Sequence, residues 1–479
     1  MTGDDGIAAP LAVGSANSKV YGAAGEDGLR PSQPRWRVVL LCVVICLATV
    51  AEGYDVGVLN GVIVRMKDDL NVSTFEVSLV VSVTPLFVVF GSLLGGAAAD
   101  SIGRRFALVG TCLVLAAGPL MMAFAPNFSA LLLGRSVVGL GIGMGFVVVS
   151  MFVTEIAPSE LRGSLISCED LMLNCGILLG YTMNLVLLGV EHDWRIMLGF
   201  GAFLPLVLAI LLACPGTPES PRWLCLQGRF EEASVVLHKF LAADEADLAL
   251  RAMREQISGP GGCNVTWQQL LWSSDRSVWR ALFSCIAMGV AQVSCGYLVV
   301  GYYSSGILAS SMSEHAAFMA TFLIGCVKLA FVLVVMTILE RVGRRPLILI
   351  STVGTVASTG ILALSFLLRW SPWIQVLSLC LFMAAYSLGQ GPLVFVYVSE
   401  VLVSELRAKG LSLSFFVSRI FGTMSTLFFP LLAEATSLGN AFLLQTLWNL
   451  CMLALLWAII VESHGRTLEE MASLFHEKP

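Results

Sequence analysis

Two oppositely charged side chains interrupt long apolar stretches of this sequence. Asp55 lies mid-way along the first apolar stretch, and Arg135 lies inside the fourth. A carboxylate that ionises at the centre of a membrane-spanning helix costs at least about 2.5 kcal/mol. An acid that pairs with a cation when ionised, and releases it when protonated, converts proton binding into a structural change. We therefore predict that Asp55 and Arg135 form a proton-coupling pair, with a permanent structural ion pair as the alternative.

Three other charged residues lie within apolar stretches. Lys328 is expected to extend toward a membrane surface or to pair near a helix end. Arg419 is expected to face the centre of the protein, where it could bind an anionic group or neutralise a buried acid. Glu52 lies one position from Gly53 on another helix face, and we assign it no role.

Composition limits what these residues can belong to. Of 479 residues, 57% are hydrophobic and only 13% are charged, against roughly 25% charged in soluble proteins. These values exclude a soluble globular enzyme, a disordered chain and a nucleic-acid binder. The 13 Cys residues fall mostly inside apolar stretches and show no zinc-ligand spacing, so we expect buried thiols, no metal site and no cofactor. A nucleotide-binding Gly-Lys-Ser/Thr loop is also missing, which argues against an ATP-driven pump.

The apolar stretches predict the elements that hold these charges. About 20 apolar residues are needed to cross a bilayer, and we predict membrane-spanning helices over 36–64, 75–99, 106–125, 128–153, 163–189, 195–214, 280–309, 315–339, 346–368, 373–403, 408–434 and 440–461. The prediction is an all-α membrane protein of twelve transmembrane helices in two six-helix halves. Its parts are a flexible cytosolic tail (1–35), the first half (36–214), a cytosolic linker with short helices (215–279), the second half (280–461) and a cytosolic tail (462–479).

Basic residues set the orientation. With both termini in the cytosol, most of the 28 Lys and Arg residues fall in cytosolic segments, and the outer segments hold only Arg65, Lys67, Arg195 and Arg369. This asymmetry follows the positive-inside rule, and an odd number of helices would spoil it.

Short charged motifs repeat between the two halves at nearly one offset. The segment from Asp100 to Arg105 recurs from Glu340 to Arg345, and Pro218-Glu219-Ser220 recurs as Val461-Glu462-Ser463. Such repeats indicate a duplicated six-helix unit, and folds of this kind bind their substrate near the membrane midplane between the halves.

The same motifs are expected at the cytosolic surface, where weak ion pairs suit a switch. Surface pairs contribute about 0–1 kcal/mol each, and opposite charges on facing halves could close the cytosolic side reversibly. The alternative is that the arginines only set topology. The predicted gate consists of Asp100, Arg104, Arg105, Glu155, Arg162, Glu219, Glu340, Arg344, Arg345, Glu400, Arg407 and Glu462.

Taken together, the motifs resemble the sugar porter family of the major facilitator superfamily, and most closely the plant-type polyol/monosaccharide proton symporters. The resemblance spans about residues 36–471. It is carried by Gly53–Gly57, Asp100–Arg105, Gly134-Arg135, Glu155–Gly163, Pro218–Leu224, Glu340–Arg345, Gly391-Pro392, Ser399-Glu400 with Arg407, and Gly465–Glu470. It implies the major facilitator fold, and in proton-coupled members the matching Asp and Arg perform the coupling.

The resemblance also implies a substrate site between the halves. Asp170 matches a carboxylate of polyol-type members, where hexose carriers have Gln. Gln292 is kept, whereas Val293 and Leu298 stand where hexose carriers have amides, so a plain glucose carrier is disfavoured. The implied substrate-binding set is Asp170, Gln292, Val293, Leu298, Tyr302, Gly391, Phe395 (family Trp), Ser418 (family Asn) and Arg419.

The resulting hypothesis is a secondary active transporter, not an enzyme. It would move a sugar or polyol by alternating access with a proton, in a lipid bilayer and without a nucleic-acid partner. The plasma membrane is the expected location, with an internal membrane as the alternative. A facilitative uniporter and a porter for a non-sugar organic solute remain open. A non-transporting sugar sensor is disfavoured because only a short tail follows the last predicted helix.

Overall fold

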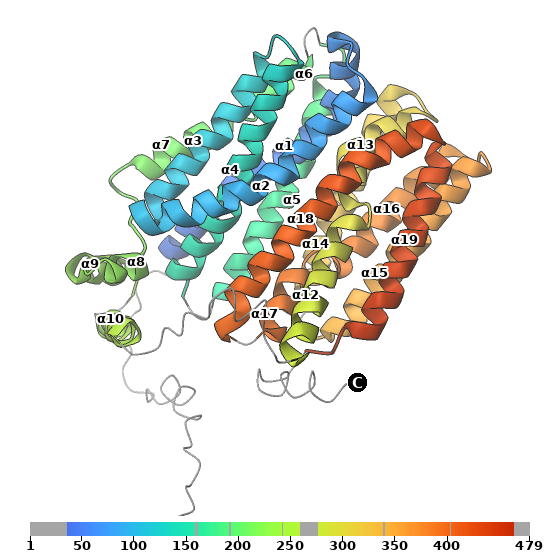
Figure 1. Ribbon diagram of the computed structural model, residues 1–479. Coiled ribbons are helices and arrows are strands. Elements are labelled where there is room, and N and C mark those ends of the chain that lie inside the picture. The colour runs from blue at the N-terminus through green and yellow to red at the C-terminus, as the bar shows by residue number, and fades with distance from the viewer. Residues whose placement is uncertain are drawn as a thin grey trace, which may run out of the picture.

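The computed structural model describes residues 36–158, 161–190, 193–241, 243–258, 276–338, 341–402 and 404–463. The predicted tails, 1–35 and most of 462–479, therefore lie outside the described residues. Figure 1 shows two bundles of helices side by side, the first in blue to green and the second in yellow to red.

The first bundle holds six membrane-spanning stretches. These are α1 (Trp36–Leu70), α2 (Thr74–Ile102), α3 (Arg104–Ala123), α4 (Phe128–Ile156), α5 (Arg162–Val186) and a final stretch made of α6 (Asp193–Phe200) and α7 (Phe203–Ala213). The short amphipathic helices α8 (Pro221–Leu226), α9 (Phe230–Phe240) and α10 (Ala243–Ser258) follow. They lie at the end of the bundle where α17 and α19 also end (Figure 1), as the predicted cytosolic linker requires.

The second bundle repeats the pattern with more breaks. It consists of α12 (Arg276–Ser294), α13 (Tyr297–Ala309), α14 (Glu314–Ile338), α15 (Arg344–Leu367), α16 (Pro372–Leu388), α17 (Leu393–Val401), α18 (Ser404–Ala435) and α19 (Leu438–Ile459). Eleven helical stretches are long and apolar enough to cross a membrane, and Pro372–Leu388 is a shorter apolar helix. The twelve predicted spans are therefore present among the described residues.

Three predicted spans are interrupted rather than continuous, and the first is the span over 195–214, which divides into α6 and α7. The span predicted over 280–309 breaks between α12 and α13 at Gly296, whose φ of 103° is accessible to glycine at no steric cost. The span predicted over 373–403 breaks between α16 and α17, where Gly389 to Pro392 intervene. Such breaks free backbone groups for other partners near the centre of a transporter fold.

In the described residues, three helix pairs make most of the contact between the two halves. Across the interface α1 packs on α13, α2 on α18 and α5 on α14. One buried apolar cluster crosses this boundary, because it contains Leu59 of α1 together with Val293 of α12 and Leu298 of α13.

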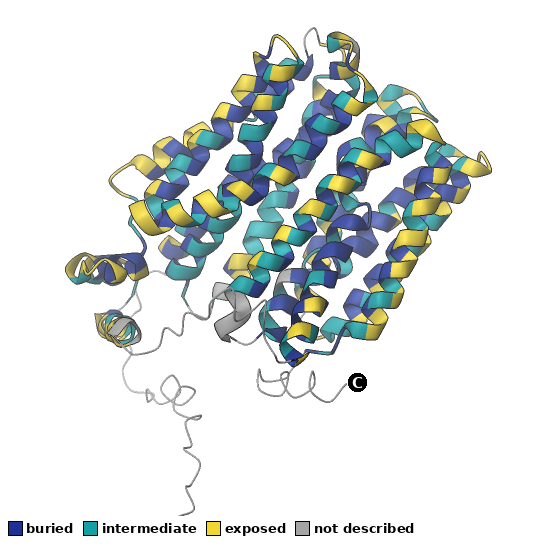
Figure 2. Ribbon diagram, viewed as in Figure 1, coloured by how far each residue is buried: buried dark blue, intermediate teal, exposed yellow. Residues whose placement is uncertain are grey.

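Exposure follows the membrane environment. Figure 2 shows buried residues where helices face one another and exposed residues on outward faces. The exposed residues include large apolar side chains such as Leu93, Ile210, Trp373 and Trp457. In lipid such faces carry no penalty, because the lipid tails are as apolar as these side chains.

Candidate functional site

Asp55 and Arg135 form an ion pair in the interior of the first half, in which one guanidinium nitrogen contacts both carboxylate oxygens. The Arg135 Nη1 atom donates to Asp55 Oδ1 at 2.6 Å and to Asp55 Oδ2 at 2.8 Å. The Arg135 side chain is fully buried, and that of Asp55 is 6% exposed. The Arg135 Nε atom also donates to the carbonyl oxygen of Val80 on α2 at 3.3 Å. The predicted partners are therefore in direct contact.

Tyr302 lies beside this pair, although the sequence placed it in the substrate set. It is buried on α13 in the second half and interacts with the Arg135 guanidinium. The guanidinium of the first half thus binds a carboxylate of its own half and lies beside a hydroxyl of the other half, while its Nη2 atom has no hydrogen-bond partner among the described residues.

A second set of charged and aromatic side chains lies around Asp170 on α5. Lys328 of α14 faces Asp170 across the interface between the halves. The Lys328 Nζ atom donates to the Tyr297 hydroxyl at 2.8 Å, and Tyr297 stacks on Tyr386 with ring centroids 4.3 Å apart. Lys328 is only 6% exposed. Of the two alternatives predicted for Lys328, extension to a membrane surface is wrong, because its ammonium group has polar and aromatic partners inside the bundle. It pairs instead, but at the middle of α14 rather than near a helix end.

Gln292, Gly391 and Ser418 meet in the second half. The Gln292 Nε2 atom donates to the Gly391 carbonyl at 2.9 Å. Gln292 and Ser418 both line a small cavity, with Gly289, Val394, Val398, Leu411, Ser414 and Phe415. A larger hollow of about 500 Å³ lies at the cytosolic surface beside Arg105 and Trp223, far from these residues, so size alone does not locate the solute site.

Other members of the predicted substrate set lie elsewhere. Val293 and Leu298 are buried in the apolar cluster between the halves, so the lost amides were replaced by packing residues rather than by new ligands. Arg419 on α18 lies over the rings of Phe415 and Phe146, at 4.4 and 5.6 Å. The side chain of Phe395 lies outside the described residues.

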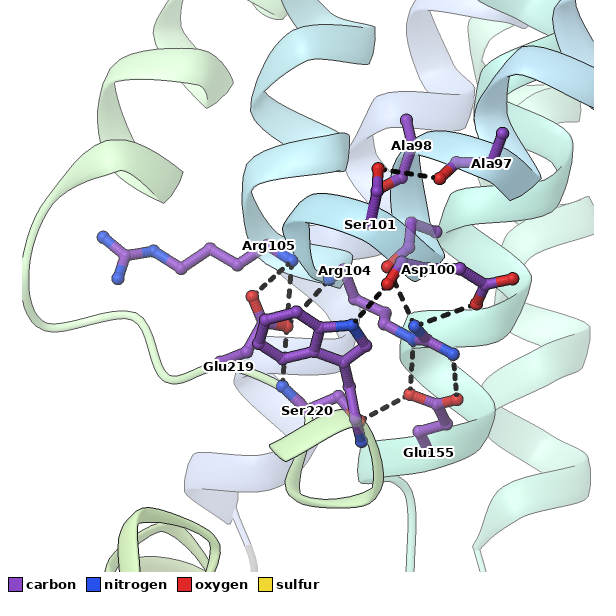
Figure 3. Close-up of polar contacts among 11 residues, drawn as sticks. Ala97, Ala98, Asp100, Ser101, Arg104, Arg105, Glu155, Glu219 and Ser220 are labelled. Carbon is purple, nitrogen blue, oxygen red and sulfur yellow. Dashed lines mark hydrogen bonds and ion pairs between the residues drawn. The ribbon is translucent and has the colours of Figure 1, made fainter. Parts of the chain in front are cut away.

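The charged motif of the first half, predicted at the cytosolic surface, forms one compact cluster (Figure 3). Arg104 donates from Nε and Nη2 to the Glu155 carboxylate at 2.9 and 3.0 Å, and its Nη1 lies 3.2 Å from Asp100 Oδ1. Ser220 donates to the same Glu155. Glu219 accepts the backbone N–H groups of Arg104 and Arg105 at 2.9 and 3.1 Å, which satisfies two of the unpaired donors at the start of α3.

Burial raises the pKa of the Glu219 carboxyl above its ordinary value. The backbone N–H groups of Ser220, Arg105 and Arg104 oppose that rise. Arg105 extends away from the cluster, and its guanidinium donates to the carbonyl oxygens of Leu212, Ala213 and Cys214 at the end of α7.

In the described residues of the second half, the contacts of Arg104, Glu155, Glu219 and Ser220 are repeated by Arg344, Glu400, Glu462 and Ser463. Arg344 donates to Glu400 at 3.0 Å, and Ser463 donates to the same carboxylate at 2.6 Å. Glu462 accepts the backbone N–H groups of Arg344 and Arg345 at 2.8 and 3.2 Å.

These contacts join residues of one half and not of facing halves. The sequence predicted opposite charges that meet across the halves, whereas the described contacts of each cluster hold several helix ends of a single half together. Of the remaining gate residues, Glu340 and the side chains of Arg162 and Arg407 lie outside the described residues.

The comparisons with known proteins agree with this geometry. A family model described as sugar (and other) transporter matches residues 41–475. The chain belongs to this sugar transporter family. It is 31% identical to polyol transporter 5 of Arabidopsis thaliana, with 94% of this chain and 88% of the relative covered. It is 30% identical to the glucose transporter GlcP of Staphylococcus epidermidis, with 92% and 97% covered.

Solved structures establish the fold of this sugar transporter family member. The inward open xylose transporter XylE from E. coli matches with a TM-score of 0.79 at 21% identity, over 91% of this chain and 99% of that chain. The XylE structure described as a major facilitator superfamily proton:xylose symporter matches with a TM-score of 0.75 at 22% identity, over 91% and 99%. The predicted twelve-helix major facilitator fold is therefore confirmed, and the protein is a multi-pass membrane protein.

Sequence reasoning missed two groups of residues in this transporter. Asn60 and Arg65 connect α1 to the second half near the outer ends of the helices. Glu52 and Glu169 are acids in the interior of the first half. A charge within an apolar stretch was the available signal for Glu52, and it was set aside because its helix face differs from that of Asp55.

Proposed function

We propose that this protein is a secondary transporter of the plasma membrane that carries a sugar or polyol by alternating access together with a proton. It performs no chemical conversion of the solute. The names of the related polyol and xylose transporters support the solute class. The buried Asp55–Arg135 pair is the single observation that carries proton coupling.

The pair offers a physical route from protonation to movement. A proton on Asp55 removes the charge that holds Arg135 in the first half. The guanidinium then keeps the Val80 carbonyl and the neighbouring Tyr302 hydroxyl as partners. Because Tyr302 belongs to the second half, protonation strengthens an interaction between the halves at the expense of one inside the first half.

The solute would bind between Asp170 and the polar groups of the second half. A carboxylate accepts two or more hydroxyl donors, and an amide both accepts and donates, so Asp170 and Gln292 suit a polyhydroxylated solute. The stacked Tyr297 and Tyr386 rings add an apolar face, as sugar-sized ligand sites require alongside a few polar groups. Lys328, which faces Asp170, can donate to a hydroxyl oxygen.

The two cytosolic clusters would hold helix ends together in one state and exchange ion-pair partners in another. Each fixes several helix ends within one half, so that a half moves as a rigid body during alternating access. We infer that Arg104, Glu155, Arg344 and Glu400 exchange partners when the cytosolic side closes.

Proteoliposomes with an internal pH dye test this function. Sorbitol, mannitol, myo-inositol, xylose, glucose and a small organic acid are offered in turn with an inward proton gradient. We expect internal acidification that depends on one polyol or sugar. Uptake without acidification would indicate a uniporter, and uptake of the acid alone would remove the sugar or polyol assignment.

One variant and one matched control test whether Asp55 couples the proton to transport. Asp55→Asn should abolish accumulation against a gradient while solute exchange at equal concentrations persists. Asp244→Asn, on the exposed face of α10, should behave like the unchanged protein. Concentrative uptake by the Asp55→Asn protein would show that Asp55 does not couple the proton.

A further inference from the structure

Glu52 is a buried acid on α1 with no role in the pair described above. Its side chain is 1% exposed, and neither carboxylate oxygen has a hydrogen-bond partner among the described residues. One of these oxygens packs directly against Gly145 of α4, where a side chain would displace it. The carboxyl group is therefore confined without being satisfied.

A second acid, Glu169, lies close to Glu52. Thr49, one turn before Glu52, donates to the Glu169 carbonyl at 3.1 Å and so fixes α1 against α5 at this level. The Glu169 carboxylate accepts from the Ser150 hydroxyl of α4, with Oγ 2.8 and 2.9 Å from its two oxygens. Of the two interacting acids, only Glu169 is thus stabilised by a donor.

Arg419 faces this pair from the other half. Its guanidinium lies over Phe146, the residue that follows Gly145, and over Phe415. Its Nε atom is buried and unpaired, and it interacts electrostatically with Glu52. Glu52 and Arg419 face one another across the interface, yet they are not within 4 Å as an ion pair in the described part of the chain.

The remaining charged or titratable neighbours complete this environment. Cys112 of α3 interacts with Glu52, and its thiol lies in the buried core. Asp55, three residues later on α1, uses both carboxylate oxygens to bind Arg135. Neither of these groups compensates a negative charge on Glu52.

The energetic cost of ionisation indicates which of the two carboxyl groups, Glu52 or Glu169, carries a proton. An ionised carboxylate in a dry interior without donors costs far more than a neutral one, and two neighbouring carboxylates with one distant cation do not both ionise. Because Ser150 stabilises the charge on Glu169, the shared proton resides on Glu52.

We propose that Glu52 is a second proton-carrying group of the transport cycle, controlled by the distance between its carboxyl and the Arg419 guanidinium of the opposite half. This inference rests on the proposed proton-coupled function. When rocking of the halves brings Arg419 into contact, Glu52 ionises and its proton passes to water on the open side. When Arg419 withdraws, Glu52 takes up a proton again. The cycle then moves two protons with each solute, one on Asp55 and one on Glu52.

Reversal potentials in proteoliposomes count these protons, with the most active solute of the panel above as the probe. We expect two protons per solute in the unchanged protein and one in Glu52→Gln. The exposed Glu434→Gln variant of α18 should keep two. An unchanged count in Glu52→Gln would overturn the proposal. Loss of uptake with every solute in the unchanged protein would instead count against the proposed function.

Infrared difference spectroscopy gives a readout that needs no solute. The carbonyl band of a protonated carboxylic acid should be weaker in Glu52→Gln than in the unchanged protein at neutral pH, and the lost component should titrate away as the pH rises. Glu169→Gln removes the neighbouring negative charge but not the burial of Glu52, so the same component should persist and titrate at a lower pH than in the unchanged protein. A band that is equal in both proteins, or that never titrates, would refute a proton-carrying role.

Discussion

Asn60 of α1 and Ser305 of α13 bond one another twice across the interface between the halves. The Ser305 backbone N–H donates to Asn60 Oδ1 at 3.1 Å, and the Ser305 hydroxyl donates to the Asn60 carbonyl at 2.7 Å. The Asn60 Nδ2 atom also donates to the Gly301 carbonyl at 2.8 Å and to Ser304 Oγ at 2.9 Å. Further out, Arg65 pairs with Glu314 of α14 at 3.0 Å. One buried amide therefore holds the outer side of the bundle closed.

Removal of this amide should favour outer opening. Asn60→Ala loses three side-chain hydrogen bonds, each about 0.5–1.5 kcal/mol, so the closed state should lose roughly tenfold or more in population. Hydrogen–deuterium exchange of the peptide that covers 297–309 measures this as faster exchange. Ser304→Ala, which loses one of these bonds, serves as the graded control and should show a smaller effect. Equal exchange in all three proteins would mean that Asn60 does not latch the halves.

Replacing Arg135 alone should destabilise the protein more than replacing Asp55 and Arg135 together. Arg135→Met leaves a buried carboxylate without its partner, which costs about 3–5 kcal/mol. Combining Asp55→Asn with Arg135→Met removes the uncompensated charge, so the double variant should unfold at a higher temperature than Arg135→Met alone. Thermal unfolding of the purified protein in detergent gives the comparison. If the double variant is the less stable of the two, the pair is not the dominant electrostatic interaction at this point.

The sequence predicted contacts within each half much better than contacts between halves. Arg104–Glu155 and Arg344–Glu400 follow from motifs that repeat with the six-helix unit, and Asp55–Arg135 follows from two charges at matching depth. Contacts such as Asn60–Ser305 depend on how two bundles are rotated against one another. No periodicity in one chain encodes that rotation, because it differs between the states of a transporter.

The charged interior was only partly predictable for a related reason. Depth within an apolar stretch identifies a buried charge, which is how Asp55, Arg135 and Arg419 were found. The partner of such a charge lies on another helix, so the sequence leaves open whether Lys328 extends to a membrane surface or pairs near a helix end, and it does not identify Asp170 and Tyr297 as its neighbours. Glu52 lies on another helix face than Asp55, yet that face is also buried, because α1 packs against both α4 and α5.

Substitution of Asp170 should weaken solute binding more than it weakens the fold. Asp170→Ala removes an acceptor of solute hydroxyls, and a lost hydrogen bond to a charged group is worth about 1.5–3 kcal/mol, so KM should rise at least tenfold. Lys328→Met should raise KM in the same direction because it leaves Asp170 without its cation. Ser167→Ala, near the cytosolic end of α5, is the control. An unchanged KM in Asp170→Ala with normal uptake would remove Asp170 from the site.

Glu219 should impose a pH dependence on stability. Burial raises the pKa of its carboxyl in the folded protein above the ordinary value of 4.5. The folded state therefore binds this proton more tightly than the unfolded state, so the associated stabilisation is complete below pH 4.5 and declines as the pH rises through the raised pKa. Glu219→Gln should flatten the unfolding temperature against pH in this window, whereas the exposed Glu245→Gln should follow the unchanged protein. Parallel profiles for all three would exclude this contribution.

Gly103 and Gly343 occupy equivalent turns but should respond differently to an added methyl group. At both positions a Cβ atom would collide with a glutamate carboxylate, Glu219 at Gly103 and Glu462 at Gly343. Gly103 also has φ 94° and ψ 162°, a conformation that costs a non-glycine residue about 1–3 kcal/mol, whereas φ at Gly343 is −59°. We expect Gly103→Ala to lower the unfolding temperature more than Gly343→Ala. Gly110→Ala on α3, where the added methyl meets no atom within 4 Å, should be neutral or slightly stabilising. If Gly343→Ala proves the more damaging, the collision with the carboxylate outweighs the backbone strain at Gly103.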